Sequence, residues 1–102
     1  MQKPLKRSNV PTVRLGALFP QTDLSAADAR AYAEGVEELG FDHLLLYEHV
    51  LGADPRAHPE FPGPWSFTMD DPLHEPFVLF GYLAGLTHRI ELVTSVLVLP
   101  QR

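Results

Sequence analysis

The chain has 102 residues, and its 13 acidic and 8 basic side chains give a formal net charge of −5 at pH 7. That length allows one domain, and 45% hydrophobic with 21% charged residues is a globular balance that excludes disorder throughout. The acidic balance argues against nucleic acid and anionic membranes as partners, because both repel a negative chain. The lack of cysteine excludes a disulfide scaffold, a thiolate metal site and a cysteine nucleophile.

The N-terminal segment is basic, with four Lys or Arg and no acidic residue in residues 1–14. No apolar core of a secretory signal follows it, and no apolar run approaches the roughly 18 residues of a membrane span. We therefore expect a flexible tail over residues 1–12, one domain over residues 13–102, and a soluble cytoplasmic protein.

The first predicted elements are a strand over residues 13–19 and a helix that Ser25 caps, with Asp28 completing an acidic variant of the capping box. Gly40 stands where a left-handed C-terminal cap is wanted. The apolar stripe of this helix has i, i+3, i+4, i+7 spacing and consists of Ala29, Tyr32, Ala33, Val36 and Leu39.

A second strand is predicted over residues 42–47, where three consecutive leucines favour burial on both faces, as in a parallel sheet. Residues 49–74 hold five of the ten prolines and show no periodicity, which is typical of a functional or mobile loop. Pro76 then suits the first position of a second helix, capped by Glu75. Its predicted stripe consists of Phe77, Phe80, Leu83, Ala84 and Leu86.

The last predicted strand covers residues 90–99 and completes a β-α-β-α-β order. Both crossovers are long enough for parallel connections, so the order allows a Rossmann-like sheet or the start of a (β/α)8 barrel. The residues after the first strand contain no glycine, which argues against Rossmann-type dinucleotide binding.

Polar side chains at the carboxyl ends of the predicted strands are the candidates for chemistry, because reactive residues collect there in parallel α/β folds. Glu48 and His49 follow the second strand, and a histidine beside a carboxylate can move protons near neutral pH. The structural alternative is a pair bonded to loop backbone. A metal site through Glu48 and His49 has no short ligand spacing to support it.

Thr94, Ser95 and Val96 place two hydroxyls inside an otherwise apolar strand, and a buried hydroxyl must find a partner. That partner is either a backbone carbonyl at a bulge or a ligand at the open end of the strand. The aromatic residues in the stretch 61–67 either cover an apolar ligand or pin the loop to the body.

An ordered series of segments resembles the bacterial luciferase-like monooxygenase family, and most closely its deazaflavin (coenzyme F-420) branch. The segments are Phe19–Gln21, Glu38–Leu44, Tyr47–Val50, Pro76–Val78, Leu86–Leu92, and Thr94–Val96 through Pro100. The resemblance covers nearly the whole chain from residue 13 onward.

This resemblance implies a (β/α)8 barrel that uses the deazaflavin or, as second choice, FMN. It implies that His49 is catalytic, as an acid/base or charge-stabilising group beside the reactive ring, and that Glu48 binds the cofactor. Thr94, Ser95 and Val96 match a cofactor-binding bulge behind the ring, in which the family often holds a cis peptide, here at Ser95–Val96.

A (β/α)8 barrel takes around 250 residues, so we expect the chain to represent its incomplete N-terminal β-α-β-α-β part. The expected function is hydride transfer on paired donors, including a small-molecule substrate, with no metal. The alternative is a non-catalytic fragment that needs a partner chain, with homo-oligomers formed through exposed strand edges.

Overall fold

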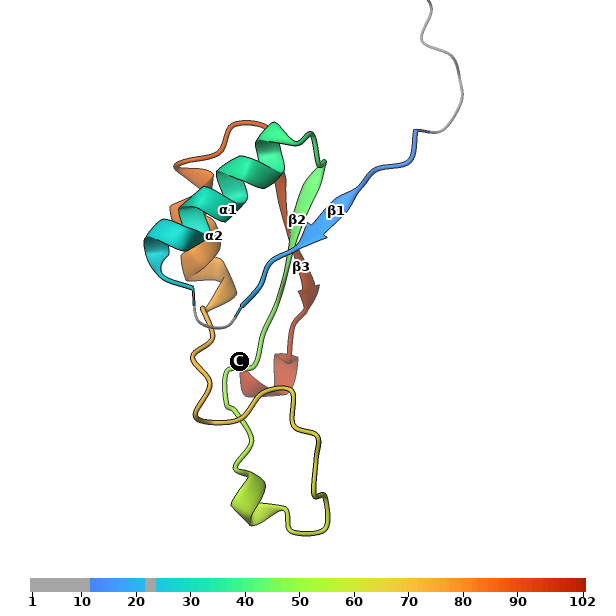
Figure 1. Ribbon diagram of the computed structural model, residues 1–102, viewed down its shortest axis with the longest axis vertical. Coiled ribbons are helices and arrows are strands. Elements are labelled where there is room, and N and C mark those ends of the chain that lie inside the picture. The colour runs from blue at the N-terminus through green and yellow to red at the C-terminus, as the bar shows by residue number, and fades with distance from the viewer. Residues whose placement is uncertain (1–11, 22–23) are drawn as a thin grey trace, which may run out of the picture.

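The computed structural model describes residues 12–21 and 24–102, which form a mixed α/β structure with a three-stranded sheet (Figure 1). All strands are parallel, and their order is β1-β2-β3. The elements are β1 (Gly16–Leu18), α1 (Ala26–Glu38), β2 (His43–Tyr47), the 3₁₀ helix η1 (Pro55–Ala57), α2 (Pro76–Ala84), β3 (Glu91–Val96) and the 3₁₀ helix η2 (Leu99–Gln101).

Local capping fixes both ends of α1, as predicted. Ser25 Oγ accepts the Asp28 amide at 3.1 Å, and the Asp28 carboxylate accepts the Ser25 amide at 3.3 Å, which together complete a capping box. At the other end Gly40 has φ of 89°, and its amide donates to the Glu37 carbonyl. The next amide, of Phe41, donates to the Val36 carbonyl, so α1 ends in a Schellman motif.

The start of α2 is also as predicted, but its buried face is so only in part. Glu75 caps the helix by accepting the Val78 amide at 2.7 Å, and Pro76 takes the first helical position. The predicted stripe was right at Leu83, which is fully buried, and at Phe80, which packs against the core, but it was wrong at Phe77, which is 52% exposed. Packing against α1 and the sheet selects the face formed by Pro76, Leu79 and Leu83.

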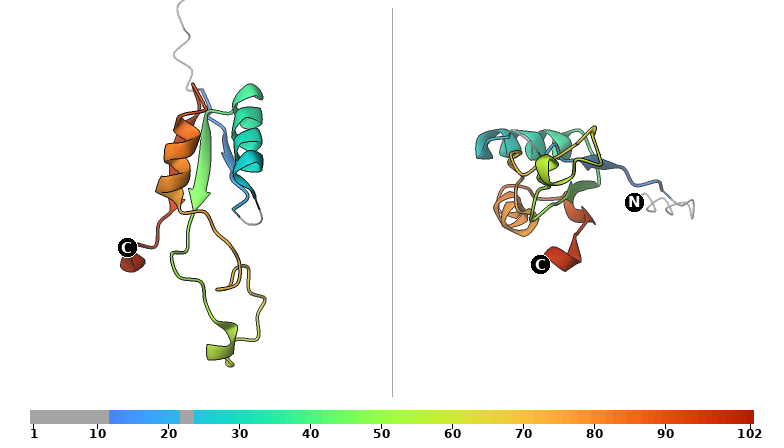
Figure 2. Two further views of the ribbon diagram at one scale, coloured as in Figure 1. Left: turned by 90° about the vertical axis from the view of Figure 1, so that its left-hand side faces the viewer. Right: turned by 90° about the horizontal axis from the view of Figure 1, so that it is seen from below.

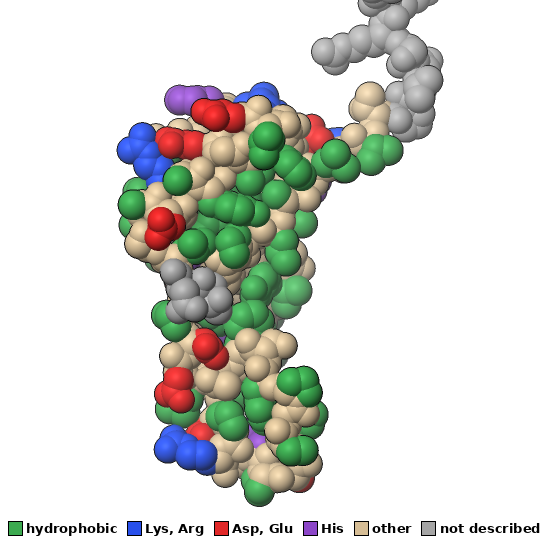
Figure 3. All heavy atoms as spheres, viewed as in Figure 1, with side chains coloured by type: hydrophobic (Ala, Val, Ile, Leu, Met, Phe, Trp, Pro, Cys, Tyr) green, Lys and Arg blue, Asp and Glu red, His purple; other side chains and the backbone are tan. Residues whose placement is uncertain are grey.

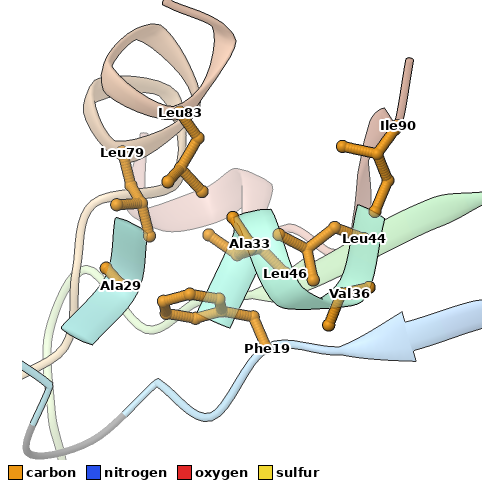
Figure 4. Packing of buried hydrophobic residues seen from close by; sticks show 9 residues of the cluster. All are labelled: Phe19, Ala29, Ala33, Val36, Leu44, Leu46, Leu79, Leu83 and Ile90. Atoms are coloured by element: carbon orange, nitrogen blue, oxygen red, sulfur yellow. The ribbon is translucent and has the colours of Figure 1, made fainter. Parts of the chain in front are cut away.

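Both helices cover the same face of the sheet (Figures 1 and 2). The core between helices and sheet is formed by Phe19, Ala29, Ala33, Val36, Leu44, Leu46, Leu79, Leu83 and Ile90 (Figure 4). Each of these side chains is at most 7% exposed. The predicted stripe of α1 supplies three of them, whereas Leu39, its predicted last member, is 78% exposed.

In the part of the chain that the structure describes, the opposite face of the sheet carries no helix. Side chains alternate across a strand, and in β2 the buried Leu44 and Leu46 alternate with the half-buried His43, Leu45 and Tyr47. The prediction that β2 is buried on both faces was therefore wrong, because only the side chains on the helix-covered face are fully buried. The neighbouring strand β1 shares this open face, where Leu18 is 55% exposed beside Leu45.

A bulge interrupts β3 at the predicted hydroxyl residues. Leu46 pairs with Thr94 but Tyr47 pairs with Val96, so Ser95 is the extra residue. Ser95 Oγ donates to the Leu46 carbonyl at 3.0 Å, which is the backbone partner that one interpretation of the sequence required. The expected cis peptide at Ser95–Val96 is not present; in residues 12–21 and 24–102 the cis peptide lies at Gly63–Pro64.

The sheet is consistent with part of a (β/α)8 barrel, while closure into a barrel stays a prediction. The basic tail over residues 1–12 lies, except for its last residue, outside the described residues. Among the helices of the described ranges, none is both long and apolar enough to cross a bilayer.

Candidate functional site

The carboxyl ends of the three strands point toward the segment 49–74, which we call the mouth loop, and toward η2 (Figure 1). This is the edge of a parallel sheet where binding and catalytic residues gather in α/β folds. The space-filling view shows the mouth loop as a lobe below the helices and sheet (Figure 3). The candidate site lies where that lobe meets the strands.

An open pocket of about 460 Å³ occupies this junction, and we call it the mouth pocket. Its lining residues are His49, Leu51, Gly52, Ala53, Trp65, Ser66, Phe67 and Gln101. Phe67 connects the loop to the sheet, because its ring lies 5.4 Å from that of Tyr47 and 6.0 Å from that of His49, between centroids. The pocket is thus large enough for a drug-sized ligand and has aromatic walls with a few polar groups, as small-molecule sites usually do.

Glu48 lies beside the mouth pocket but is buried, with 2% of its side chain exposed. Its Oε1 accepts hydrogen bonds from the Val98 amide at 3.1 Å and from Arg102 Nε at 2.7 Å, and Arg102 Nη2 donates to its Oε2. The bonds from Arg102 lower the pKa of Glu48 below its ordinary value, although burial acts in the opposite direction. Glu48 is therefore a charged carboxylate held by an arginine.

Arg102 joins Glu48 to the start of α2. Its Nη2 also donates to Glu75, and its guanidinium lies over the Phe77 ring, with Cζ 4.6 Å from the centroid. Hydrogen bonds to Glu48 and Glu75 raise the pKa of Arg102. In Glu75 the pKa is lowered, first by the bond from the Val78 amide and then by Arg102. One cation therefore links the end of β2 to the N-cap of α2.

Gln101 binds the backbone that follows His49. Its Oε1 accepts the Val50 amide at 3.0 Å and the Leu51 amide at 3.1 Å, and its Nε2 donates to the Leu51 carbonyl at 3.4 Å. Sequence reasoning missed both Gln101 and Arg102. Their partners lie about 50 residues away in the chain, and no local pattern signals such contacts.

The two limbs of the mouth loop meet next to the mouth pocket. The Met69 amide donates to the Ala53 carbonyl at 2.8 Å. A Cβ at Gly52 would lie only 2.5 Å from the Thr68 carbonyl oxygen, so the limbs approach this closely only with glycine there. Farther out, the Trp65 ring packs edge-on against Phe61 at 5.0 Å. Of the two roles expected for the aromatic stretch, Phe67 performs the second, because it attaches the loop to Tyr47 and His49. Covering an apolar ligand stays a prediction, although Trp65 and Phe67 line the pocket.

The predicted site residues do not all meet. Glu48 and His49 together line a second pocket of about 120 Å³, which α2 borders through Glu75 and Pro76. Residues 94–96 lie at the same end of the sheet, beside Leu46 and Tyr47. The roles predicted for His49, Glu48, Thr94, Ser95 and Val96 stay predictions.

Two further observations bear on the chemistry of this edge. Within the described ranges, no group of three His, Asp or Glu lies close enough to hold a metal ion, which gives the alternative of a metal site at Glu48 and His49 no support. Gln21, at the end of β1, is 1% exposed and donates from Nε2 to the Tyr47 carbonyl at 2.5 Å. Its amide therefore ties the ends of β1 and β2 together at the mouth.

His49 is exposed at this edge, and its imidazole lines both pockets. Glu48 is buried and paired, so it contributes negative charge and position next to His49 and is not free to bind a ligand without moving Arg102.

Comparison with known proteins identifies the family of the chain. The family model described as luciferase-like monooxygenase matches residues 10–102. No curated protein and no solved structure gives a significant match. The family match covers far more than half of the sequence and includes every strand, both α-helices and the mouth loop. The chain belongs to the luciferase-like monooxygenase family.

Proposed function

We propose that the chain forms part of a flavin-type oxidoreductase site, in which a deazaflavin (coenzyme F-420), or FMN as second candidate, binds at the mouth pocket. The reaction acts on paired donors, with hydride transfer between the cofactor and a small-molecule substrate at the carboxyl ends of the strands of a (β/α)8 barrel. The observation that carries the proposal is the position of His49 in an aromatic-walled pocket at this edge. Membership of a family of monooxygenases supports it.

The residues of the mouth pocket are of the kinds that hold a flavin-type ring. Trp65 and Phe67 would offer apolar faces to a planar ring, while His49 and Ser66 would offer polar groups to its edge. When bound, the cofactor supplies the hydride chemistry. The chain's own residues bind and orient it through the aromatic walls, and hold or move a proton at the imidazole of His49.

A fluorescence titration tests cofactor binding directly. Trp65 is the only tryptophan in the sequence and lines the pocket, so its emission reports on a ligand there. We expect micromolar binding of the deazaflavin or FMN with quenching of Trp65, and weaker binding by Phe67→Ala. Phe61→Ala is the control, because Phe61 contacts Trp65 but does not line the pocket. Unchanged Trp65 emission at millimolar concentrations of both cofactors would contradict the proposal.

The proposed role of His49 predicts a specific kinetic pattern. His49→Ala removes the proton-transfer group and leaves the aromatic walls intact, so we expect it to lower turnover far more than cofactor affinity. The measurement is kcat beside the Kd of the cofactor in the same preparation. An equal loss of both would show that His49 serves binding alone.

A second candidate role is supported by the open face of the sheet. Leu18 and Val96 are 55% and 54% exposed on edge strands, and unpaired strand edges recruit other strands. Under this alternative a second copy of the chain completes the sheet and the chain alone is not catalytic. Sedimentation equilibrium with and without cofactor distinguishes the cofactor-binding proposal from this alternative. A monomer that binds cofactor contradicts the alternative, and a dimer that does not bind cofactor favours it.

A further inference from the structure

We propose that Gln101 and Arg102 are positioning residues that together hold the backbone on both sides of His49; we call the two side chains the η2 clamp. Their function as positioning residues rests on the function proposed for His49. The clamp itself is a structural arrangement that can be tested whether or not a flavin binds.

Arg102 holds the residue before His49. Its side chain is 26% exposed and binds both oxygens of Glu48, whose side chain is 2% exposed. A carboxylate that is buried and paired in this way cannot rotate without breaking charge-assisted hydrogen bonds. The contacts of Arg102 with Glu75 and the Phe77 ring anchor the arginine on α2, which packs on the core. The end of β2 is thus fixed relative to the body.

Gln101 holds the two residues after His49. Its Oε1 accepts both amides, of Val50 and Leu51, in a single bifurcated contact, and its Nε2 donates back to the Leu51 carbonyl. Within residues 12–21 and 24–102 these amides have no other acceptor, because the segment after His49 belongs to no helix or strand. Gln101 therefore replaces the regular hydrogen bonding that the chain loses where β2 ends.

His49 has no such restraint of its own. Its imidazole packs against Phe67, with ring centroids 6.0 Å apart, and makes no hydrogen bond within the described ranges. The position from which the imidazole enters the mouth pocket is thus set by its backbone, which the clamp holds at residues 48, 50 and 51, and the ring itself rests on Phe67. A proton-transfer group must be held close to its productive geometry to be effective. The clamp supplies that restraint from a segment that also lines the pocket through Gln101.

Amide hydrogen exchange of the full chain tests the clamp. In Gln101→Ala we expect the Val50 and Leu51 amides to exchange at least about tenfold faster, because they lose their acceptor. The amides of Leu44 and Leu46 in β2 should keep their protection, which shows that the loss is local. Nuclear Overhauser contacts between the rings of His49 and Phe67 should weaken in the same variant.

Gln101→Glu is the conservative variant, because its carboxylate still accepts both amides but cannot donate to the Leu51 carbonyl. It should restore the protection that Gln101→Ala loses. Arg30→Ala is the matched control for Arg102→Ala, since Arg30 forms an exposed ion pair with Glu34 on α1, far from the mouth. Arg102→Ala should raise exchange near residue 48 and weaken the contact between His49 and Phe67, whereas Arg30→Ala should do neither.

Two results would overturn the clamp: unchanged exchange at Val50 and Leu51 in Gln101→Ala, or equal acceleration in β2, which shows general destabilisation. If Gln101→Ala does not fold, the same comparison is made with Gln101→Asn, whose shorter side chain withdraws the acceptor. Failure of the proposed function gives a different result from failure of the clamp. The amide exchange rates of the variants then change as predicted, while Trp65 emission does not change when either cofactor is added. Where turnover is measurable, Gln101→Ala should lower kcat more than it raises the cofactor Kd.

Discussion

The body of the molecule, formed by the three strands with α1 and α2, and the mouth loop are stabilised by different interactions. The body buries nine apolar side chains between helices and sheet. The loop is held instead by a few backbone hydrogen bonds, by local polar turns such as Thr68 with Asp71, and by ring contacts. Segments with few buried apolar contacts open more easily than a packed core. The mouth pocket therefore lies between a packed body and a loop with few buried apolar contacts.

The candidate site lies at the junction of the two regions because each supplies a different part of it. Phe67 of the loop packs on Tyr47 of the sheet and on His49. The body holds the backbone of His49 through β2 and the proposed η2 clamp, while the loop supplies the aromatic wall of the pocket. The following predictions disturb the body first and then the loop, and their expected effects on stability decrease in that order.

Leu83→Ala should have the largest effect, because Leu83 is fully buried between α2 and the core. We expect a loss of about 2–5 kcal/mol in the free energy of unfolding, from lost burial and the cavity left behind. Urea unfolding followed by circular dichroism measures it. Val78→Ala on the same helix is the control, since Val78 is 74% exposed and should change stability by no more than about 0.5 kcal/mol. Equal losses in both variants would disprove the packing described for α2.

Glu37→Gln should have an intermediate and pH-dependent effect on the body. The Glu37 carboxylate accepts the amides of His88, Arg89 and Ile90 at 2.7–3.1 Å, which ties the end of α1 to the start of β3. These bonds lower the pKa of Glu37 from its ordinary 4.5. The stabilisation is therefore present above that value and is lost as the pH falls through the lowered pKa.

Unfolding measured from neutral pH down to about pH 3 tests this prediction. At neutral pH the substitution should cost about 1 kcal/mol, because the amide oxygen is a weaker acceptor than the carboxylate. The difference in unfolding free energy between wild type and Glu37→Gln should become smaller as the pH falls. Glu38→Gln is the control, since Glu38 is the exposed neighbour on α1. If this difference in unfolding free energy stays constant with pH, the charge of Glu37 is not the source of the stabilisation.

Gly52→Ala should change the loop and leave the body nearly unaffected. The added Cβ would lie 2.5 Å from the Thr68 carbonyl oxygen and 2.6 Å from Met69 Cα, so the limbs must separate. We expect faster exchange of the Met69 amide and weaker cofactor binding, with a change in unfolding free energy below about 1 kcal/mol.

Gly35→Ala provides the contrast to Gly52→Ala. Nothing lies within 4 Å of a Cβ at position 35, and alanine in a helix interior is favoured by roughly 0.5–1 kcal/mol over glycine. This variant should therefore stabilise the body and leave the loop and its ligand binding unchanged. Loss of cofactor binding in Gly35→Ala would show that the two regions are not separable.

The sequence predicts those parts of the fold that depend on neighbouring residues. The Ser25 capping box, the Gly40 cap and the Glu75–Pro76 helix start all follow from local hydrogen bonding and backbone preference. The buried face of α2 was not predictable in the same way. In a helix that is apolar nearly all round, only packing decides that Leu79 is buried and Phe77 is exposed.

The candidate site also has parts that local sequence patterns predict and parts that they do not. Glu48 and His49 could be found because the end of a parallel strand marks functional positions. The bulge at Ser95 could be found because two hydroxyls interrupt an apolar strand, although its peptide bond was wrongly expected to be cis. The η2 clamp could not be found, because Gln101 and Arg102 act on residues about 50 positions away and follow no periodic pattern.

The central claim is that a flavin-type cofactor binds in the mouth pocket beside His49. The most direct measurement is a nitrogen–proton correlation spectrum of the full chain, titrated with the deazaflavin and with FMN. We predict saturable shifts at His49, Ser66, Phe67 and the Gln101 side-chain amide, with Glu34 and Val78 on the helix surfaces unchanged. Shifts confined to the helix surfaces, or no saturable shift with either cofactor, would contradict the account.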